Sequence, residues 1–213
     1  MNFRLILPML LLFAAPAFAG AAAKGWISGN FSAASYAMTG VNADISRINS
    51  ALAQSGLSMN LVTKGFSLGA TAGRDLGHGL TVGVGYDRLF AHSRVTGAST
   101  SVSYGVPANL VRVLGRFAFV TGDKSNDFVE LSIGRASTAG ALSVSAPGIA
   151  PRSGSLTNSG IAYELGLGSR EWISPRYAIT GGFGYRHARS GGAHLTDYSG
   201  LFLRAGVTRA LAK

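Results

Sequence analysis

Eight short segments of this chain alternate large apolar residues with small or polar ones. In the clearest segment, residues 177–186, one parity reads Tyr, Ile, Gly, Phe, Tyr and the other reads Ala, Thr, Gly, Gly, Arg. A period of two places the two parities on opposite faces of a β-strand, so each segment is predicted to be a strand. The eight segments are 26–31, 66–73, 80–87, 110–119, 129–134, 161–168, 177–186 and 201–208.

The composition of the second face distinguishes a membrane barrel from a soluble one. This face carries mostly glycine, serine, threonine and alanine, and only 13% of the chain is charged whereas 47% is hydrophobic. A face in contact with water would carry more charge, whereas small residues suit a narrow interior. We therefore predict an all-β fold, an eight-stranded antiparallel transmembrane β-barrel with its apolar face toward lipid. A soluble barrel or sandwich is the alternative.

The first 19 residues have the pattern of a secretory signal peptide. Arg4 provides the positive start, Leu5–Phe13 the short apolar stretch, and Ala17-Phe18-Ala19 the cleavage site. We therefore expect a barrel domain over residues 20–213, although cleavage after Ala23 is also possible. After this leader no run approaches the ~18 apolar residues of a spanning helix. The mean hydropathy of +0.27 is thus attributed to the strands.

The connections between the segments alternate between short and long. The short ones lie at 75–79, 121–127 and 173–176, and the longer ones at 95–108, 138–159 and 187–199. Short turns on one side and long loops on the other are typical of outer-membrane barrels. The pattern predicts a location in the cell outer membrane, with both termini periplasmic.

The first long connection has a helical period. Apolar residues from Ile45 to Leu57 recur at spacings of three, four and five, with polar residues between them. We predict a short amphipathic helix in this first extracellular loop, beginning near Asn42 or Asp44 and ending at Gly56. It could lie on the membrane surface, plug the barrel mouth, or only cover loop backbone.

Two glycine- and aromatic-rich segments carry a family resemblance. With Leu80–Tyr86 (LTVGVGY) and Tyr177–Tyr185 (YAITGGFGY), the chain resembles the small eight-stranded outer-membrane barrels of the OmpA and OmpX kind over about residues 25–211. The resemblance implies insertion by the barrel assembly machinery, and we expect a monomer. Members usually end in an aromatic residue, whereas this chain has Arg209 near an end that reads Leu-Ala-Lys.

Charged residues on the polar parity are predicted to lie inside the barrel. An eight-stranded barrel is just wide enough to be filled by side chains, and charges buried there must pair. They form either a plug of salt bridges or a gated ion path. The predicted lumen network is Asp87, Arg112, Arg116, Glu130, Glu164, Arg170, Arg186 and Arg204.

Some of the basic residues behind the formal net charge of +10 lie in or beside the predicted outer loops. Basic residues are scattered singly along the chain, so nucleic acid is not an expected partner. The expected partners are outer-membrane lipid and lipopolysaccharide, because guanidinium and ammonium groups donate charge-assisted hydrogen bonds to phosphates. The candidate lipopolysaccharide contacts are Arg47, Lys64, Arg94, Arg152 and Arg189.

No pattern predicts catalytic, cofactor-binding or metal-binding residues. The chain has no cysteine, and its glycine clusters do not open a helix after a strand. His187 and Ser190 suggest a hydrolase, because some lipid A deacylase barrels have a His-x-Ser pair. Here, however, the spacing between the two residues is one residue longer. That spacing puts the two side chains on opposite faces of an extended chain. The predicted function is therefore non-enzymatic, in envelope integrity or surface interaction. A small low-conductance channel and a lipid A-modifying enzyme are the alternatives.

Overall fold

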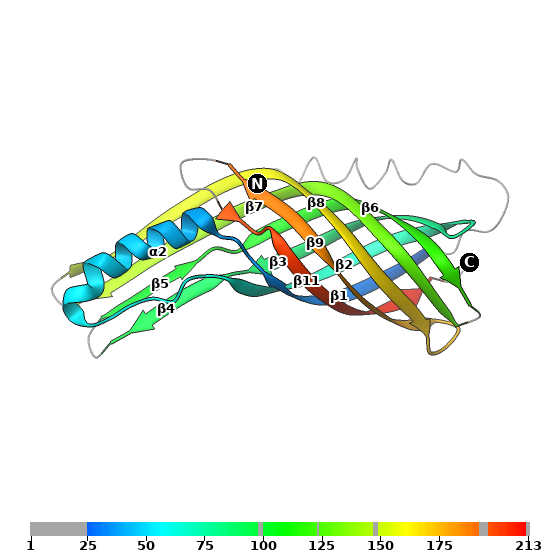
Figure 1. Cartoon of the computed structure of the whole chain (residues 1–213), viewed down its shortest axis with the longest axis horizontal. Helices are drawn as coiled ribbons and strands as arrows, with labels where there is room; N and C mark the ends of the chain where they lie inside the picture. Colours follow the sequence, from blue (N-terminus) through cyan, green and yellow to red (C-terminus); the bar gives the residue numbers. More distant parts are fainter. Residues whose placement is uncertain (1–24, 98–99, 123, 147–148, 192–195, 212–213) are drawn as a thin grey trace.

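The strands of the computed structural model close into a barrel (Figure 1). The structure describes residues 25–97, 100–122, 124–146, 149–191 and 196–211. Each long strand is antiparallel to the next, and the last pairs with the first. The eight strands are β1 (Gly25–Ser35), β2 (Lys64–Gly77), β3 (Leu80–Phe90), β6 (Ala108–Thr121), β7 (Ser125–Ala146), β8 (Ile149–Trp172), β9 (Tyr177–Ser190) and β11 (Gly200–Ala210). The predicted eight-stranded antiparallel barrel is confirmed. The predicted leader lies outside the described residues.

The two faces of the wall follow the predicted parity. On β8, Ile161, Tyr163 and Leu165 are exposed, whereas the alternate residues Ala162 and Glu164 are buried. Exposed fractions of large apolar side chains reach 68% at Ile161, which a surface in contact with water would disfavour. The outer face of the barrel is therefore apolar, whereas the inner face carries the buried charged residues together with small and apolar ones.

The two ends of the barrel differ. We call the end with the short connections 78–79, 122–124 and 173–176 the turn end, and the opposite end the helix end. At the turn end, Gly77 and Gly79 have φ of +90° and +76°, which suits glycine on either side of the tight β2–β3 turn. The described chain begins and ends here, because Trp26 of β1 pairs with Ala210 of β11.

At the helix end the wall continues beyond the eight-stranded ring. The short strands β4 (His92–Thr96) and β5 (Ser101–Gly105) form a hairpin that pairs with β7, and β10 (Thr196–Asp197) pairs with β9. The prediction of long loops at 95–108 and 138–159 was therefore wrong over most of their length. The residues of 138–159 are mostly Ala, Gly, Ser and Thr on both faces, so they give no alternation of large and small side chains.

A helix covers the helix end (Figure 1). The helix α2 (Thr39–Leu52) passes into the 3₁₀ turn η2 (Ala53–Ser55) and ends at Gly56, with φ of +65°. The prediction of a helix ending at Gly56 is confirmed, but the helix begins three residues earlier than Asn42. None of the helices in the described part of the chain is long and apolar enough to cross a membrane.

The inner face of the helix packs on an apolar cluster that we call the cap core. Val41 and Ile45 of α2 are buried against it, and two tyrosines, Tyr36 and Tyr198, meet edge to face in it. The cap core comprises Tyr36, Met38, Val41, Ile45, Met59, Val62, Leu89, Ala91, Val102, Tyr104, Val106, Ala108, Leu110, Ala136, Ala162, Ala188 and Tyr198.

Two asparagines of α2 hold the segment that returns to β2. The side chain of Asn42 donates to the carbonyl of Val62 at 3.0 Å and accepts from its N–H at 2.8 Å. Asn49 makes the same pair of bonds with Met59, at 2.9 and 2.7 Å. Each amide thus imitates one backbone pairing of a β-ladder, and the return segment is fixed along the helix.

Candidate functional site

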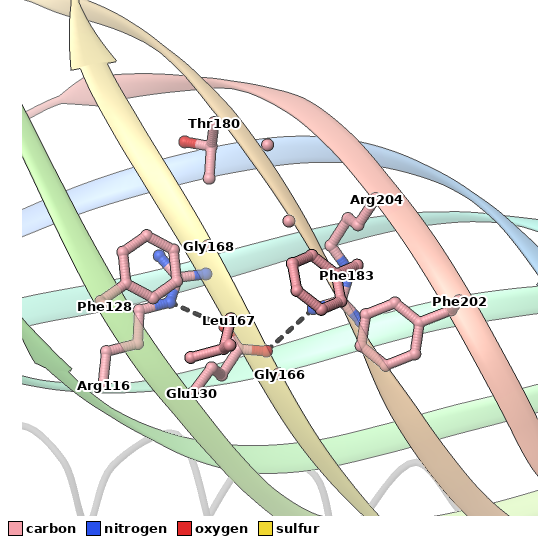
Figure 2. Close-up of a pocket in the computed structure, with 12 residues that line it drawn as sticks. Arg116, Phe128, Glu130, Gly166, Leu167, Gly168, Thr180, Phe183, Phe202 and Arg204 are labelled. Atoms are coloured by element: carbon pink, nitrogen blue, oxygen red, sulfur yellow. Dashed lines mark hydrogen bonds and ion pairs between the residues drawn. The ribbon is translucent and has the colours of Figure 1, made fainter.

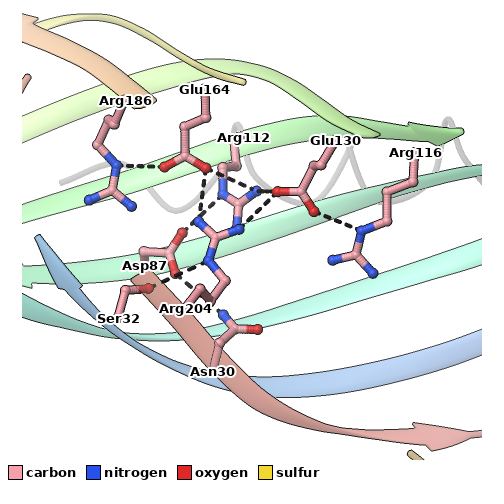
Figure 3. Close-up of polar contacts among 9 residues, drawn as sticks. All are labelled: Asn30, Ser32, Asp87, Arg112, Arg116, Glu130, Glu164, Arg186 and Arg204. Carbon is pink, nitrogen blue, oxygen red and sulfur yellow. Dashed lines mark hydrogen bonds and ion pairs between the residues drawn. The ribbon is translucent and has the colours of Figure 1, made fainter. Parts of the chain in front are cut away.

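The interior between the cap core and the turn end is filled by charged side chains (Figure 3). Arg112 of β6 lies at the centre. Its Nε is 2.9 Å from Asp87 Oδ2, and its Nη1 is 3.0 Å from Glu130 Oε1 and 3.4 Å from Glu164 Oε2. Gly85, on the neighbouring strand, leaves the space in which this guanidinium lies.

The other arginines extend the arrangement in both directions. Arg204 of β11 contacts both glutamates, with Nη1 2.8 Å from Glu130 Oε1 and Nη2 2.9 Å from Glu164 Oε2. The other oxygen of Glu130 is 2.7 Å from Arg116 Nε, and the other oxygen of Glu164 is 2.5 Å from Arg186 Nε. We use the name lumen network for these seven residues: Asp87, Arg112, Arg116, Glu130, Glu164, Arg186 and Arg204.

The local sequence explains why these groups meet. Each lies on the inward parity of its strand, and Arg112 and Arg116 are four residues apart on β6. Their side chains are at most 11% exposed. Burial of an ion is costly unless it is paired and hydrogen-bonded, and each glutamate here faces three arginines. The network therefore stabilises the barrel only as a complete set.

The eighth residue of the predicted lumen set, Arg170, is buried but differs in its contacts. The described residues give it no ion pair; its guanidinium lies 4.6 Å from the Trp26 ring centre and 5.9 Å from that of Trp172. Arg116 also lies over Trp26, at 4.8 Å, and over Phe128, at 4.7 Å. Sequence reasoning missed these aromatic partners. The signal was available, because Trp26 and Phe128 occupy the inward parity of their strands.

The candidate lipopolysaccharide contacts are spread over the outside of the helix end. Lys64 begins β2, Arg94 is exposed on β4, and Arg189 faces outward near the end of β9. Arg47, on α2, pairs with Asp44 at 2.8 Å. The side chain of Arg152 lies outside the described part of the structure. The other four lie on four different elements, α2, β2, β4 and β9.

Two further outward arginines were missed by sequence reasoning. The outward parity of β7 reads Val129, Leu131, Ile133 and then Arg135, so this series passes from apolar to cationic toward the helix end. On β3 the corresponding residue is Arg88, whose Nη1 donates to Asn109 at 2.7 Å. Extending the parity by one step past the apolar residues would have found both.

Arg135 and Arg189 flank one apolar residue. Arg135 of β7 pairs with Ile161 of β8. On the other side of β8, Ala162 pairs with Ala188 of β9, so Arg189, the next residue of β9, lies beside Ile161. Neighbouring strands are about 4.8 Å apart, so the two arginines start about 10 Å from each other. This is a pair of outward cations at the edge of the apolar face.

Arg189 is also anchored from inside. Its Nε is 2.8 Å from Asp197 Oδ2, and the N–H of Ser199 donates to Asp197 Oδ1 at 2.9 Å. Burial raises the pKa of Asp197, but the hydrogen bonds from Ser199 and Arg189 outweigh it and the pKa is lowered.

Burial raises the pKa of Tyr36 to about 12, and it also raises that of Tyr198, whose hydroxyl donates to the carbonyl of Val106.

The serine and histidine that suggested a hydrolase do not meet. His187 faces outward, stacked on Tyr163 at 4.6 Å, and its Nδ1 is 3.2 Å from Ser199 Oγ. Ser190 faces inward and its hydroxyl lies 3.0 Å from that of Thr138. Ser190 is therefore not placed for activation by His187.

Comparison with known proteins bears on the fold. No protein-family model matches this sequence, and a search of curated proteins found no match. Among solved structures, Ail, the attachment invasion locus protein of Yersinia pestis, in complex with the heparin analogue sucrose octasulfate, is 10% identical with a TM-score of 0.54. That similarity covers 89% of this chain and 99% of Ail. The chain has the fold of the small eight-stranded outer-membrane barrels.

Two other solved structures are similar at lower scores. Neisserial surface protein A is 17% identical, with a TM-score of 0.49 over 87% of this chain and 96% of its own. OprG from Pseudomonas aeruginosa is 11% identical, with a TM-score of 0.48 over 90% of this chain and 97% of its own. At these identities the similarity concerns the fold.

Proposed function

We propose that this protein is a non-enzymatic outer-membrane barrel whose outward arginines bind lipopolysaccharide phosphates at the helix end, and that it thereby contributes to envelope integrity. The helix end then faces the outside of the cell, and both termini face the periplasm. The observation that carries the proposal is the placement of Arg135 and Arg189 at the edge of an apolar outer face.

The chemistry of this edge suits a phosphorylated lipid. Ile133 and Ile161 are 62% and 68% exposed and would lie along acyl chains, whereas the arginines next to them would reach the phosphates. Asp197 pairs with Arg189 and Asp44 with Arg47, whereas no described carboxylate pairs with Arg135, which donates to the Ser159 hydroxyl at 2.8 Å. A lipid that is apolar at one end and anionic at the other matches both features.

The interior supports a structural role over conduction. The lumen network occupies the middle of the barrel, and the cap core and α2 cover its helix end. We propose that the barrel is plugged, is inserted by the barrel assembly machinery and acts as a monomer. Ail was crystallised with a sulfated sugar; for this chain we propose an anionic lipid because of its own rim arginines.

The test compares two forms of one lipid. The protein in nanodiscs is titrated with lipopolysaccharide whose lipid A carries its phosphates, and with the same material after enzymatic dephosphorylation. The double variant Arg135→Gln/Arg189→Gln should weaken binding of the phosphorylated form by about tenfold or more, because two charge-assisted hydrogen bonds are lost. The matched control is Arg209→Gln, an exposed outward arginine at the turn end.

The single variant Arg135→Gln should have part of the same effect without disturbing Asp197. Equal affinity for the two lipid forms, with no dependence on salt, would overturn the proposal. Ion conductance of the wild-type barrel in planar bilayers would contradict the plugged interior.

A further inference from the structure

The outer face at the turn end carries two arginines, one on either side of β1. Arg74 of β2 is the cross-strand partner of Gly25, and Arg209 of β11 is the partner of Ile27. Both are exposed and lie on the outward parity of their strands. In the described part of the chain neither makes an ion pair. A guanidinium that the protein leaves unpaired is available to an anion outside it.

Arg74 and Arg209 lie at about the same depth. The strands of a barrel are tilted, so rows of cross-strand partners climb around the wall. The row that runs from Arg209 through Ile27 and Ala72 reaches His187, near the helix end of β9. Ala72 is therefore closer to the helix end than Arg209. Arg74 lies two residues nearer the turn end on β2, which offsets the climb and returns it to the level of Arg209.

A tyrosine indicates that this level is the membrane–water interface. Tyr177 of β9 is the cross-strand partner of Arg209, and its side chain is 43% exposed. Tyrosine concentrates at the interface because its ring is apolar and its hydroxyl is polar. Toward the helix end the next outward residues of β9 and β11 are Ile179 and Val207, both exposed. Arg209 thus lies where acyl chains give way to headgroups.

The wall beside the two arginines is apolar and has a shallow depression. Ile27 and Leu211, which border the arginines, are 43% and 46% exposed. Farther along β1, Gly29 is flanked by Ala70 and Val207, and a Cβ at Gly29 would meet nothing within 4 Å. Small residues allow a neighbouring chain to approach the backbone closely. An acyl chain can therefore lie along β1 with its polar end near the arginines.

Acidic side chains are kept away from this sector. Asp75, which follows Arg74 in the sequence, faces inward and accepts a hydrogen bond from Trp26 Nε1 at 3.2 Å. The described outward residues of β11, β1, β2 and β3 near the turn end include no carboxylate. The outward carboxylates of this end, Asp127 and Glu171, lie on β7 and β8. A zwitterionic headgroup would thus bring an ammonium group for which this sector has no acidic partner.

The interior at this end has no room for a headgroup. A cavity of about 30 Å³ lies inside the β8–β9 wall and is lined by Arg116, Phe128 and Thr180 among others (Figure 2). Its volume suits water-sized groups only. A phosphorylated headgroup that binds at the turn end must therefore bind on the outer face.

We propose that Arg74 and Arg209 bind the phosphate of one anionic glycerophospholipid in the leaflet at the turn end, with an acyl chain along β1 over Gly29. Two strand spacings and a two-residue offset put the two Cα atoms about 12 Å apart, so each extended arginine side chain spans about half of the gap. Both guanidiniums donate charge-assisted hydrogen bonds to the phosphate. The site rests on the proposed membrane placement and is independent of lipopolysaccharide binding at the helix end.

The chain has no cysteine, so a single introduced one reports on this site alone. The variant Ala72→Cys, on the β2 neighbour of Ile27, is labelled with a fluorophore and refolded into phosphatidylcholine bilayers. Phosphatidylglycerol with a nitroxide on one acyl chain is compared with phosphatidylcholine carrying the same nitroxide. Half-quenching by phosphatidylglycerol should need a mole fraction about tenfold lower. The matched reporter Val129→Cys, outward on β7 near Asp127, should show no such preference.

The double variant Arg74→Gln/Arg209→Gln should remove the preference and leave quenching by phosphatidylcholine unchanged. Both side chains are exposed, so the variant should fold, as checked by its heat-dependent gel migration. Arg74→Lys/Arg209→Lys should keep part of the preference, in a form that salt weakens. The helix-end variant Arg135→Gln/Arg189→Gln should keep all of it, so failure of this site and failure of lipopolysaccharide binding can be told apart.

Three results would overturn the site. These are equal quenching by the two lipids at position 72, a preference that persists in Arg74→Gln/Arg209→Gln, and an equal preference at position 129.

Discussion

The barrel has two interiors, and a single strand passes through both. On β6 the inward residues Ala108 and Leu110 belong to the cap core, whereas Arg112, the next inward residue, and Arg116, two inward positions farther along, belong to the lumen network. The outer face changes in the opposite sense. It is apolar around the network, as at Val111, and carries serine and threonine on the β7–β8 extension beyond it.

The difference shows that alternation alone does not decide what a barrel contains. Where the outer face meets lipid, the interior receives the polar groups; where the outer face meets water, the interior is an ordinary apolar core. On β3–β4 the change falls between Asp87 and Leu89, two successive inward residues. The interior thus changes toward the same end of the barrel as the outer face, which passes from apolar to polar side chains there.

The largest effect is expected from Glu164→Gln. This change leaves Arg112, Arg186 and Arg204 with less compensating charge in a buried space. Loss of one partner of a buried ion pair costs about 3–5 kcal/mol. Urea unfolding of the refolded barrel in micelles measures it, and Glu171→Gln, exposed on the same strand, is the control. A loss below about 1 kcal/mol would mean that the network fills space without stabilising.

The variant Ile45→Ala tests how much the cap core contributes to stability. Ile45 is fully buried in the cap core, and such truncations cost about 2–5 kcal/mol. Since Ile45 contacts the cap core and not the network, α2 should become sensitive to protease while the heat-dependent gel shift of the barrel is retained. Ser46→Ala, on the exposed side of the helix, should leave α2 resistant. Joint loss of the helix and of the gel shift would show that the two interiors unfold together.

A smaller effect is expected at the helix clamp. Asn49→Ala removes both bonds to Met59, at a cost of about 1–2 kcal/mol. Hydrogen exchange at the Met59 amide should accelerate while amides facing the lumen network keep their protection. Asn49→Asp keeps the acceptor for the Met59 N–H and should retain part of the protection. Unchanged exchange in Asn49→Ala would exclude the clamp as the support of the return segment.

The smallest effect is expected from acid at Asp197. Its pKa lies below the ordinary value of 3.8, so its contribution to stability is present above about that pH and is lost as the pH falls through the lowered value. The contribution is at most about 1 kcal/mol, because Arg189 is 56% exposed. The chemical shift of the Ser199 amide should follow this titration, and Asp197→Asn should abolish it. An apparent pKa above 3.8 would contradict the arrangement.

Sequence reasoning predicted the lumen network but not the cap core. The period of two placed Arg112, Arg116 and Arg204 on one face, because their neighbours along the strands are large and apolar. It could not give the cap core, because apart from Leu110 and Ala162 its members lie outside the alternating segments, in a helix, a return segment and strand extensions. The bonds from Asn42 to Val62 have no local signal, since they join residues 20 apart whose meeting depends on the path of the intervening chain.

The position of Arg204 on the final strand has a consequence for the order of assembly. β11 must pair with β1 to close the sheet, and the same strand delivers the guanidinium that bridges Glu130 and Glu164. Until β11 is in place, both glutamates lack one cation, and until it pairs with β1 the sheet has two open edges that lipid cannot hydrogen-bond. Closure and neutralisation are therefore one cooperative event. An unfinished barrel is penalised twice in the bilayer, so stable insertion awaits the last strand.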